Sequence, residues 1–211
     1  HFVPEISAPA GHIFDRCKIW VDQGHDVTVV TNVPNYPLGE PYKGYKNRLR
    51  SWETINGIKV LRVATYMAEN KGTIKRTIDY ISFAISSFFN SLTIDKPDVV
   101  YSTSPHIFAP LGAIAFSWIK RVPHVLEVRD LWPESIAATT GMSRSSIVYR
   151  SFELIERLIY NSSKRIVVFT ESFRTNLISR GVLSDKLHVV INGANLTLFE
   201  DPVYDDELAK S

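Results

Sequence analysis

Charged and aromatic side chains follow a short apolar segment near the middle of the chain. Residues 123–128, Pro-His-Val-Leu-Glu-Val, predict a buried strand, and Arg129, Asp130, Trp132 and Glu134 come directly after it. Ligands of parallel α/β sheets bind beyond the carboxyl ends of the strands, so these side chains would meet a substrate there. The alternative is structural: an Arg129–Asp130 ion pair, packing by Trp132, and a helix that begins at the proline that follows.

Three further loops follow predicted strands or lead into helices, and each carries small or polar residues. Free backbone N–H groups and the positive end of a helix could bind an anion at the first of these loops. Taken singly, each loop is typical of an ordinary helix start. Four loops at the same edge of one sheet favour a binding site. The residues of the three loops are Ser7, Ala8, Ala10 and Gly11; Thr103 and Ser104; and Thr170 and Glu171.

Apolar periodicity predicts alternating strands and helices, separated by turn residues. The Asn56-Gly57 pair between two apolar runs predicts a hairpin. Strands separated by helices indicate an α/β fold: a Rossmann-like, doubly wound, mainly parallel sheet with helices on both faces. The predicted helices are 9–23, 73–92, a crossover helix that ends at 120, 145–160 and 171–180; the predicted strands are 27–31, 51–55, 58–63, 98–102, 125–128, 165–170 and 187–191.

Length and composition limit the classes of function that are possible. The 211 residues predict one domain over 1–199, followed by an acidic, aperiodic linker or tail over 200–211. A net charge of +2 is too small to indicate nucleic-acid binding, and the single Cys17 fits a reducing compartment. No apolar run reaches the ~18 residues of a membrane span. The chain has no G-x-G-x-x-G, P-loop or H-E-x-x-H motif and its histidines are scattered, so we expect no metal site and no cofactor.

Two segments are specific enough to compare with known families: residues 34–37, Pro-Asn-Tyr-Pro, and residues 129–135, Arg-Asp-Leu-Trp-Pro-Glu-Ser. Weaker matches are residues 4–6, 24–29, 56–60, 97–100 and the turn at 192–195. Together these motifs resemble the N-terminal half of a GT-B glycosyltransferase of family 4. The likeness is strongest to the branch of N-acetylfucosamine transferases that build capsule and O-antigen, and it covers nearly everything from Phe2 to Phe199.

The resemblance implies sugar transfer with retention from a nucleotide-sugar donor to a glycan or polyprenyl-diphosphate-linked acceptor. In such enzymes two Rossmann-like domains face each other, and the first one mainly binds the acceptor. Here a cation at Arg129 would stabilise charge near the reacting sugar, and Asp130 would orient it or the acceptor hydroxyl. The implied catalytic residues are Arg129, Asp130 and Glu134; the implied donor-diphosphate loop is Ser7, Ala8, Ala10 and Gly11; the implied acceptor and cleft residues are Thr103, Ser104, Trp132, Thr170, Glu171 and Asn192.

The same resemblance predicts what this chain lacks. The donor-binding C-terminal domain and the family's central first strand have no counterpart in the sequence, so we expect the chain alone to be inactive. A sheet without that strand would have two unpaired interior edges. We expect Arg129 and Asp130 at the carboxyl edge, open to the cleft and near Ser7–Gly11, Thr103, Ser104 and Glu171.

Two other classes of function remain open. One is a non-catalytic ligand-binding or assembly module, and the other is a sugar-nucleotide-modifying enzyme, against which the missing G-x-G-x-x-G argues. The expected location is cytoplasmic, with peripheral contact at the inner face of the membrane. Lys71, Lys75, Arg76 and the tyrosine-rich segment 34–50 would suit that contact. The apolar face of the 73–92 helix is expected to cover the sheet; its residues are Ile74, Ile78, Ile81, Ile85, Phe88 and Phe89.

Overall fold

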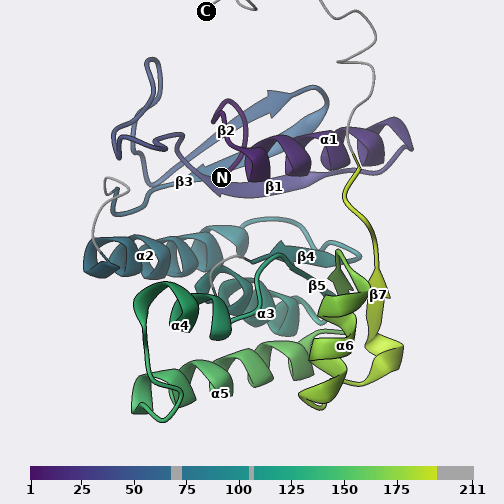
Figure 1. Cartoon of the computed structure of the whole chain (residues 1–211). Helices are drawn as coiled ribbons and strands as arrows, with labels where there is room; N and C mark the ends of the chain where they lie inside the picture. Colours follow the sequence, from purple (N-terminus) through teal and green to yellow (C-terminus); the bar gives the residue numbers. More distant parts are fainter. Residues whose placement is uncertain (68–72, 105–106, 194–211) are drawn as a thin grey trace, which may run out of the picture.

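Helices and strands alternate throughout the computed structural model, which describes residues 1–67, 73–104 and 107–193 (Figure 1). The α/β class is therefore confirmed. The predictions for the turn at 194–195 and the tail at 200–211 lie outside the described residues. The helices are α1 (Ala8–Asp22), α2 (Thr73–Ser91), α3 (Phe108–Lys120), α4 (Glu134–Thr140), α5 (Ile147–Ser162) and α6 (Glu171–Ser179), with a 3-10 turn at Ser184–Lys186. The strands are β1 (Thr28–Asn32), β2 (Arg50–Ile55), β3 (Ile58–Val63), β4 (Val100–Thr103), β5 (His124–Val128), β6 (Arg165–Val168) and β7 (Leu187–Val189).

The strands form two sheets. A three-stranded sheet has the order β1-β3-β2, and a four-stranded sheet has the order β4-β5-β6-β7. The antiparallel β2–β3 hairpin turns at Asn56-Gly57, as predicted, and every other described strand pair is parallel. Strands β1 and β4 lie at the ends of their sheets. The parallel strands expected in one sheet are thus divided between two.

The four-stranded sheet has helices on both faces. Leu126 and Val128 of β5 point to one face, where they join a buried apolar cluster with Ile114 of α3 and Leu177 of α6. Successive side chains of a strand point to opposite faces, so Glu127 points to the other face. There it contacts α1, whose Arg16 pairs with it. This alternation places a buried carboxylate next to the carboxyl edge of β5.

The expectation for α2 is wrong. Its apolar face does not cover a sheet: Ile74 is 77% exposed and Phe89 is 61% exposed, and Ile78, Ile81 and Ile85 are exposed as well. The side of the helix that carries Ala84 and Ser87 faces α3 instead. A Cβ atom added to Gly112 of α3 would lie 2.8 Å from the carbonyl oxygen of Ala84, so α2 and α3 pack backbone against backbone. Large side chains do not fit between two helices at that separation.

Candidate active site at the carboxyl edge of the four-stranded sheet

Glu127 is the centre of a buried polar cluster at the end of β5. Its side chain is fully buried, and four groups from three elements donate hydrogen bonds to it. The Nε of Arg129 lies 2.7 Å from Oε1 and the hydroxyl of Thr103 lies 3.4 Å from it. Arg16 and the hydroxyl of Tyr101 both donate to Oε2. A buried carboxylate needs such partners because its hydration is lost.

Arg129 lies between this cluster and the edge of the sheet. Its Nε also donates to Thr103 Oγ1 at 2.9 Å, and its backbone N–H donates to Ser104 Oγ at 2.9 Å. The guanidinium carbon lies 5.6 Å from the centre of the Phe169 ring. Burial lowers the pKa of Arg129, although nearby Tyr101 and Asp130 oppose that shift. Among the described residues, its buried Nη2 has no hydrogen-bond partner, so one donor of this cation is not satisfied by the protein.

The structural alternative of an Arg129–Asp130 ion pair is not what the structure shows, because Arg129 pairs with Glu127. Arg129 directly follows the last residue of β5, and its Nε turns back to Glu127 of the strand. Asp130 lies one residue further and is exposed. The side chain of Arg129 was expected to be open to the cleft, but only 11% of it is exposed. Asp130 is therefore an accessible charge at this edge, whereas Arg129 is mostly buried.

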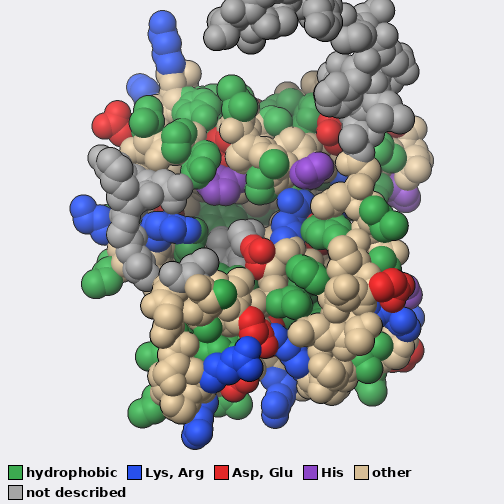
Figure 2. All heavy atoms as spheres, in the orientation of Figure 1, with side chains coloured by type: hydrophobic (Ala, Val, Ile, Leu, Met, Phe, Trp, Pro, Cys, Tyr) green, Lys and Arg blue, Asp and Glu red, His purple; other side chains and the backbone are tan. Residues whose placement is uncertain are grey.

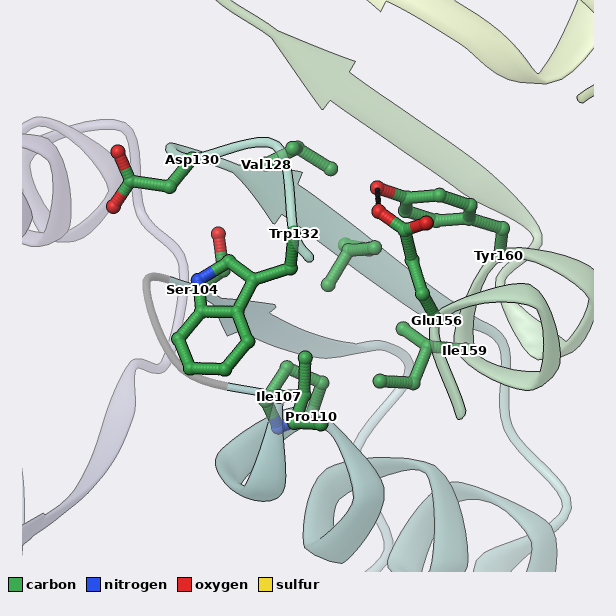
Figure 3. A pocket seen from close by; sticks show the side chains of 10 residues that line it. Ser104, Ile107, Pro110, Val128, Asp130, Trp132, Glu156, Ile159 and Tyr160 are labelled. Carbon is green, nitrogen blue, oxygen red and sulfur yellow. Dashed lines mark hydrogen bonds between the residues drawn. The ribbon is translucent and has the colours of Figure 1, made fainter. Parts of the chain in front are cut away.

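A small pocket of about 20 Å³ lies beside these groups, between β5, α3 and α5. Figure 3 shows Trp132 over its mouth, near Ser104, and the Asp130 carboxylate pointing away from the other side chains. The Trp132 ring packs edge-on against Phe152 at 5.8 Å. A volume of this size holds about one water molecule. The pocket is a packing feature next to the site and not a place for a sugar.

Glu134 is held by an ion pair with Arg180 of the α6 end. The same guanidinium donates to Glu156 at 2.7 Å and to the backbone carbonyl of Trp132 at 2.9 Å. Burial raises the pKa of Glu156 to about 7, and the Tyr160 hydroxyl donates to it at 2.6 Å. Arg180 thereby ties the loop after β5 to α5 and α6. This arrangement fixes the position of Glu134 at the start of α4.

The loop predicted to bind the donor diphosphate begins helix α1. Ser7 is its N-cap: its hydroxyl accepts the Ala10 N–H at 3.4 Å, and its carbonyl accepts the Gly11 N–H at 3.1 Å. Ala8 is exposed, whereas Ala10 is buried. Two of the N–H groups in this loop are thus already used within the helix. An anion site at this loop stays a prediction.

The remaining predicted cleft residues lie after β6 and β7. Thr170 is the N-cap of α6 and accepts the Phe173 N–H at 3.2 Å. Glu171 is exposed and pairs with Arg174 at 3.5 Å rather than with Arg129. Asn192 is exposed and lies beyond β7. These residues do not join the Glu127 cluster through any contact described by the structure.

The structure therefore brings together Thr103, Ser104 and Arg129, as predicted, and adds Glu127, Arg16 and Tyr101. Figure 2 shows this face of the molecule hollowed between an upper part, with α1 and the three-stranded sheet, and a lower part, with α4 and α5. Acidic, basic and histidine side chains lie around the hollow. The strand alternation could have revealed Glu127, since it points away from the apolar face that carries Leu126 and Val128. Arg16 gave no such signal.

The sequence of this chain matches the family described as "Glycosyl transferase 4-like domain" over residues 12–193. The chain belongs to this family. It is also similar to the putative colanic acid biosynthesis glycosyl transferase WcaI of Escherichia coli (strain K12), with 22% identity over 207 residues. That alignment covers 95% of this chain and 50% of WcaI, so the chain spans about half the length of this relative. The carboxyl edge that holds Glu127 and Arg129 lies inside the matched region of the glycosyl transferase 4-like domain.

Proposed function

We propose that this chain is the acceptor-binding half of a retaining glycosyltransferase that acts in surface polysaccharide synthesis. Its substrates would be a nucleotide sugar and a lipid-linked glycan acceptor. Membership of the glycosyl transferase 4-like family supports sugar transfer, and the similarity to WcaI supports a polysaccharide product. The length of WcaI supports a second, donor-binding half outside this chain. The free thiol of Cys17 is compatible with the proposed cytoplasmic site.

The unused Nη2 donor of Arg129 is the observation that carries this proposal. The acceptor hydroxyl would attack the anomeric carbon while the bond to the donor phosphate oxygen breaks, and the nucleoside diphosphate would leave. The guanidinium would stabilise the negative charge that develops on that oxygen. Glu127 would hold the guanidinium in place, because it binds Nε and leaves Nη2 free. Retention means that the new bond forms on the face of the sugar from which the old one departs.

The other two predicted catalytic residues would have different tasks. Asp130 is exposed next to Arg129, so its carboxylate is free to orient the acceptor hydroxyl or to accept its proton. Glu134 is paired with Arg180, so we assign it a positioning role for the loop that carries Asp130. The N-terminal end of α1, with Ser7 and Ala8, would approach the donor diphosphate from the opposite side of the hollow.

Release of nucleotide from a panel of nucleotide sugars tests the proposal. We expect release by the full-length protein when a polyprenyl-diphosphate-linked glycan is present, and none by residues 1–211 alone. The anomeric configuration of the product, read by NMR, should match that of the donor. Robust turnover by residues 1–211, or an inverted product, would contradict the proposal. Binding of the lipid-linked glycan without turnover in the full-length protein would instead favour a non-catalytic module.

A further inference from the structure

Helix α2 carries an outward stripe of large apolar side chains, which we call the α2 stripe. Its members recur at the spacing of one helix face and have no polar residue among them. They are Ile74 (77% exposed), Ile78 (46%), Ile81 (39%), Ile85 (54%) and Phe89 (61%). Scattered exposed apolar residues are ordinary on protein surfaces, but a continuous stripe on one helix indicates a partner.

The stripe cannot be buried by rotating α2 on the domain. The opposite face of α2 packs on α3 through small groups, and a Cβ atom on Gly112 would already lie 2.8 Å from the Ala84 carbonyl and 3.6 Å from Ser87 Oγ. Isoleucine side chains in place of these groups would force the helices apart. The domain therefore presents the stripe outward as part of its own packing.

Basic side chains lie on a loop that is linked to the middle of α2. Residues 43–50, which we call the basic loop, contain no acidic residue, and its cations Lys43, Lys46, Arg48 and Arg50 are all exposed. Two hydrogen bonds between Asn47 and Thr65, of 2.8 and 3.2 Å, fix this loop beside the end of β3. The next residue, Tyr66, donates its N–H to Ser82 of α2 at 2.8 Å.

Exposed cations and apolar groups thus alternate in this part of the surface. Lys75 and Arg76 of α2 are exposed, and Leu49 and Trp52 are 73% and 51% exposed. In Figure 2, Lys and Arg side chains gather at the left, at the amino-terminal end of α2. Such a surface offers apolar side chains to insert and positive charge to hold anionic groups.

We propose that the α2 stripe and the basic loop together form a docking surface for a bilayer that contains anionic lipid. The stripe would enter the boundary between headgroups and acyl chains, and the basic loop would contact the headgroups. Among the described helices, none is long and apolar enough to cross a bilayer. The inference deepens the proposed function, because a lipid-linked acceptor would then reach the carboxyl edge from the same membrane.

Vesicle co-sedimentation tests the docking surface without any donor or acceptor. The full-length protein is mixed with neutral phosphatidylcholine vesicles and with vesicles that also contain phosphatidylglycerol. We expect binding that increases with anionic lipid and decreases with salt. Replacing Ile78 and Ile85 by Glu should weaken binding by at least about tenfold. The control is Leu183→Glu, the same type of change at one residue that is 63% exposed beyond α6, and it should change binding less than about twofold.

A second pair of variants separates the charge from the apolar contact. Lys46→Glu with Arg48→Glu should abolish the preference for anionic vesicles, whereas Lys164→Glu with Arg165→Glu, at exposed residues beside the start of β6, should keep it. Far-UV circular dichroism and thermal melting check that each variant is folded.

Several results would overturn the inference: equal binding to neutral and anionic vesicles, unchanged binding of the Ile78/Ile85 variant, or no binding at all. If that variant instead converts a dimer into a monomer without lipid, a second copy of the chain covers the stripe. The outcome is independent of catalysis. A protein that transfers sugar to a detergent-solubilised acceptor but binds no vesicles refutes only the docking surface, and one that binds vesicles but transfers no sugar refutes only the proposed function.

Discussion

Replacing Glu127 by Gln keeps the shape of the side chain and removes the charge at the centre of the cluster. In the native protein this fully buried carboxylate lies between Arg129, whose side chain is 11% exposed, and Arg16, whose side chain is 24% exposed. The variant leaves two cations facing a neutral amide. Removal of one partner from a buried ion pair costs about 3–5 kcal/mol, and the partial hydration of Arg16 favours the lower value, about 3 kcal/mol.

Thermal unfolding measures this cost. For a protein of this length, about 3 kcal/mol corresponds to a melting temperature lower by about 6–12 °C. The matched control is Asp26→Asn, which breaks the exposed Lys59–Asp26 pair at 2.6 Å and should cost less than about 1 kcal/mol. Adding Arg129→Met to Glu127→Gln removes one of the two cations that have lost their carboxylate partner. The double variant should therefore lose at least about 1 kcal/mol less stability than the sum of the losses in the two single variants. A Glu127→Gln variant with the same melting temperature as the wild type would refute this account of the cluster.

Two further predictions concern the same domain. Burial lowers the pKa of His124 to about 4 from 6.5, so the folded protein binds this proton more weakly than the unfolded chain does. His124 should therefore not affect the free energy of unfolding above pH 6.5, and it should lower that free energy by about 2 kcal/mol on acidification to pH 5. Urea unfolding of His124→Gln should lack this loss. Identical pH profiles of the wild type and the variant would contradict the low pKa of His124. Gly112→Val should lower the free energy of unfolding by about 1–3 kcal/mol, because the new Cβ atom meets the Ala84 carbonyl. Gly11→Ala places its Cβ atom in open space and should change the free energy of unfolding by less than about 1 kcal/mol. Equal effects of the two substitutions would refute the close α2–α3 packing.

Local sequence signals predicted the elements and part of the site. Apolar periodicity and the Asn56-Gly57 turn located the helices and the hairpin, because both depend on neighbouring residues only. Parallel strands end at a common edge, and this rule correctly predicted that Thr103, Ser104 and Arg129 lie together. The same rule failed for Glu171, because its first-turn position allows a local pair with Arg174.

Contacts between distant segments could not be predicted in this way. The Arg16–Glu127 pair joins residues 111 positions apart, and it depends on how α1, which packs on the three-stranded sheet, meets the four-stranded sheet. Periodicity also showed that α2 has an apolar face without showing which face packs. The packing face is determined by Gly112 of α3, because its missing side chain lets the backbone of α2 approach at Ala84, and the isoleucines then point outward.

The turnover of an Arg129→Met variant tests the central claim, that the Glu127–Arg129 cluster of this domain acts in sugar transfer. The measurement is kcat for nucleotide release by the full-length protein, divided by the folded fraction, with Arg157→Met at an exposed α5 residue as the control. We predict a decrease of at least about tenfold for Arg129→Met, equivalent to about 1.4 kcal/mol of lost transition-state stabilisation, and no change for the control. An unchanged kcat per folded molecule, together with a lower melting temperature, would show that Arg129 serves only to neutralise Glu127.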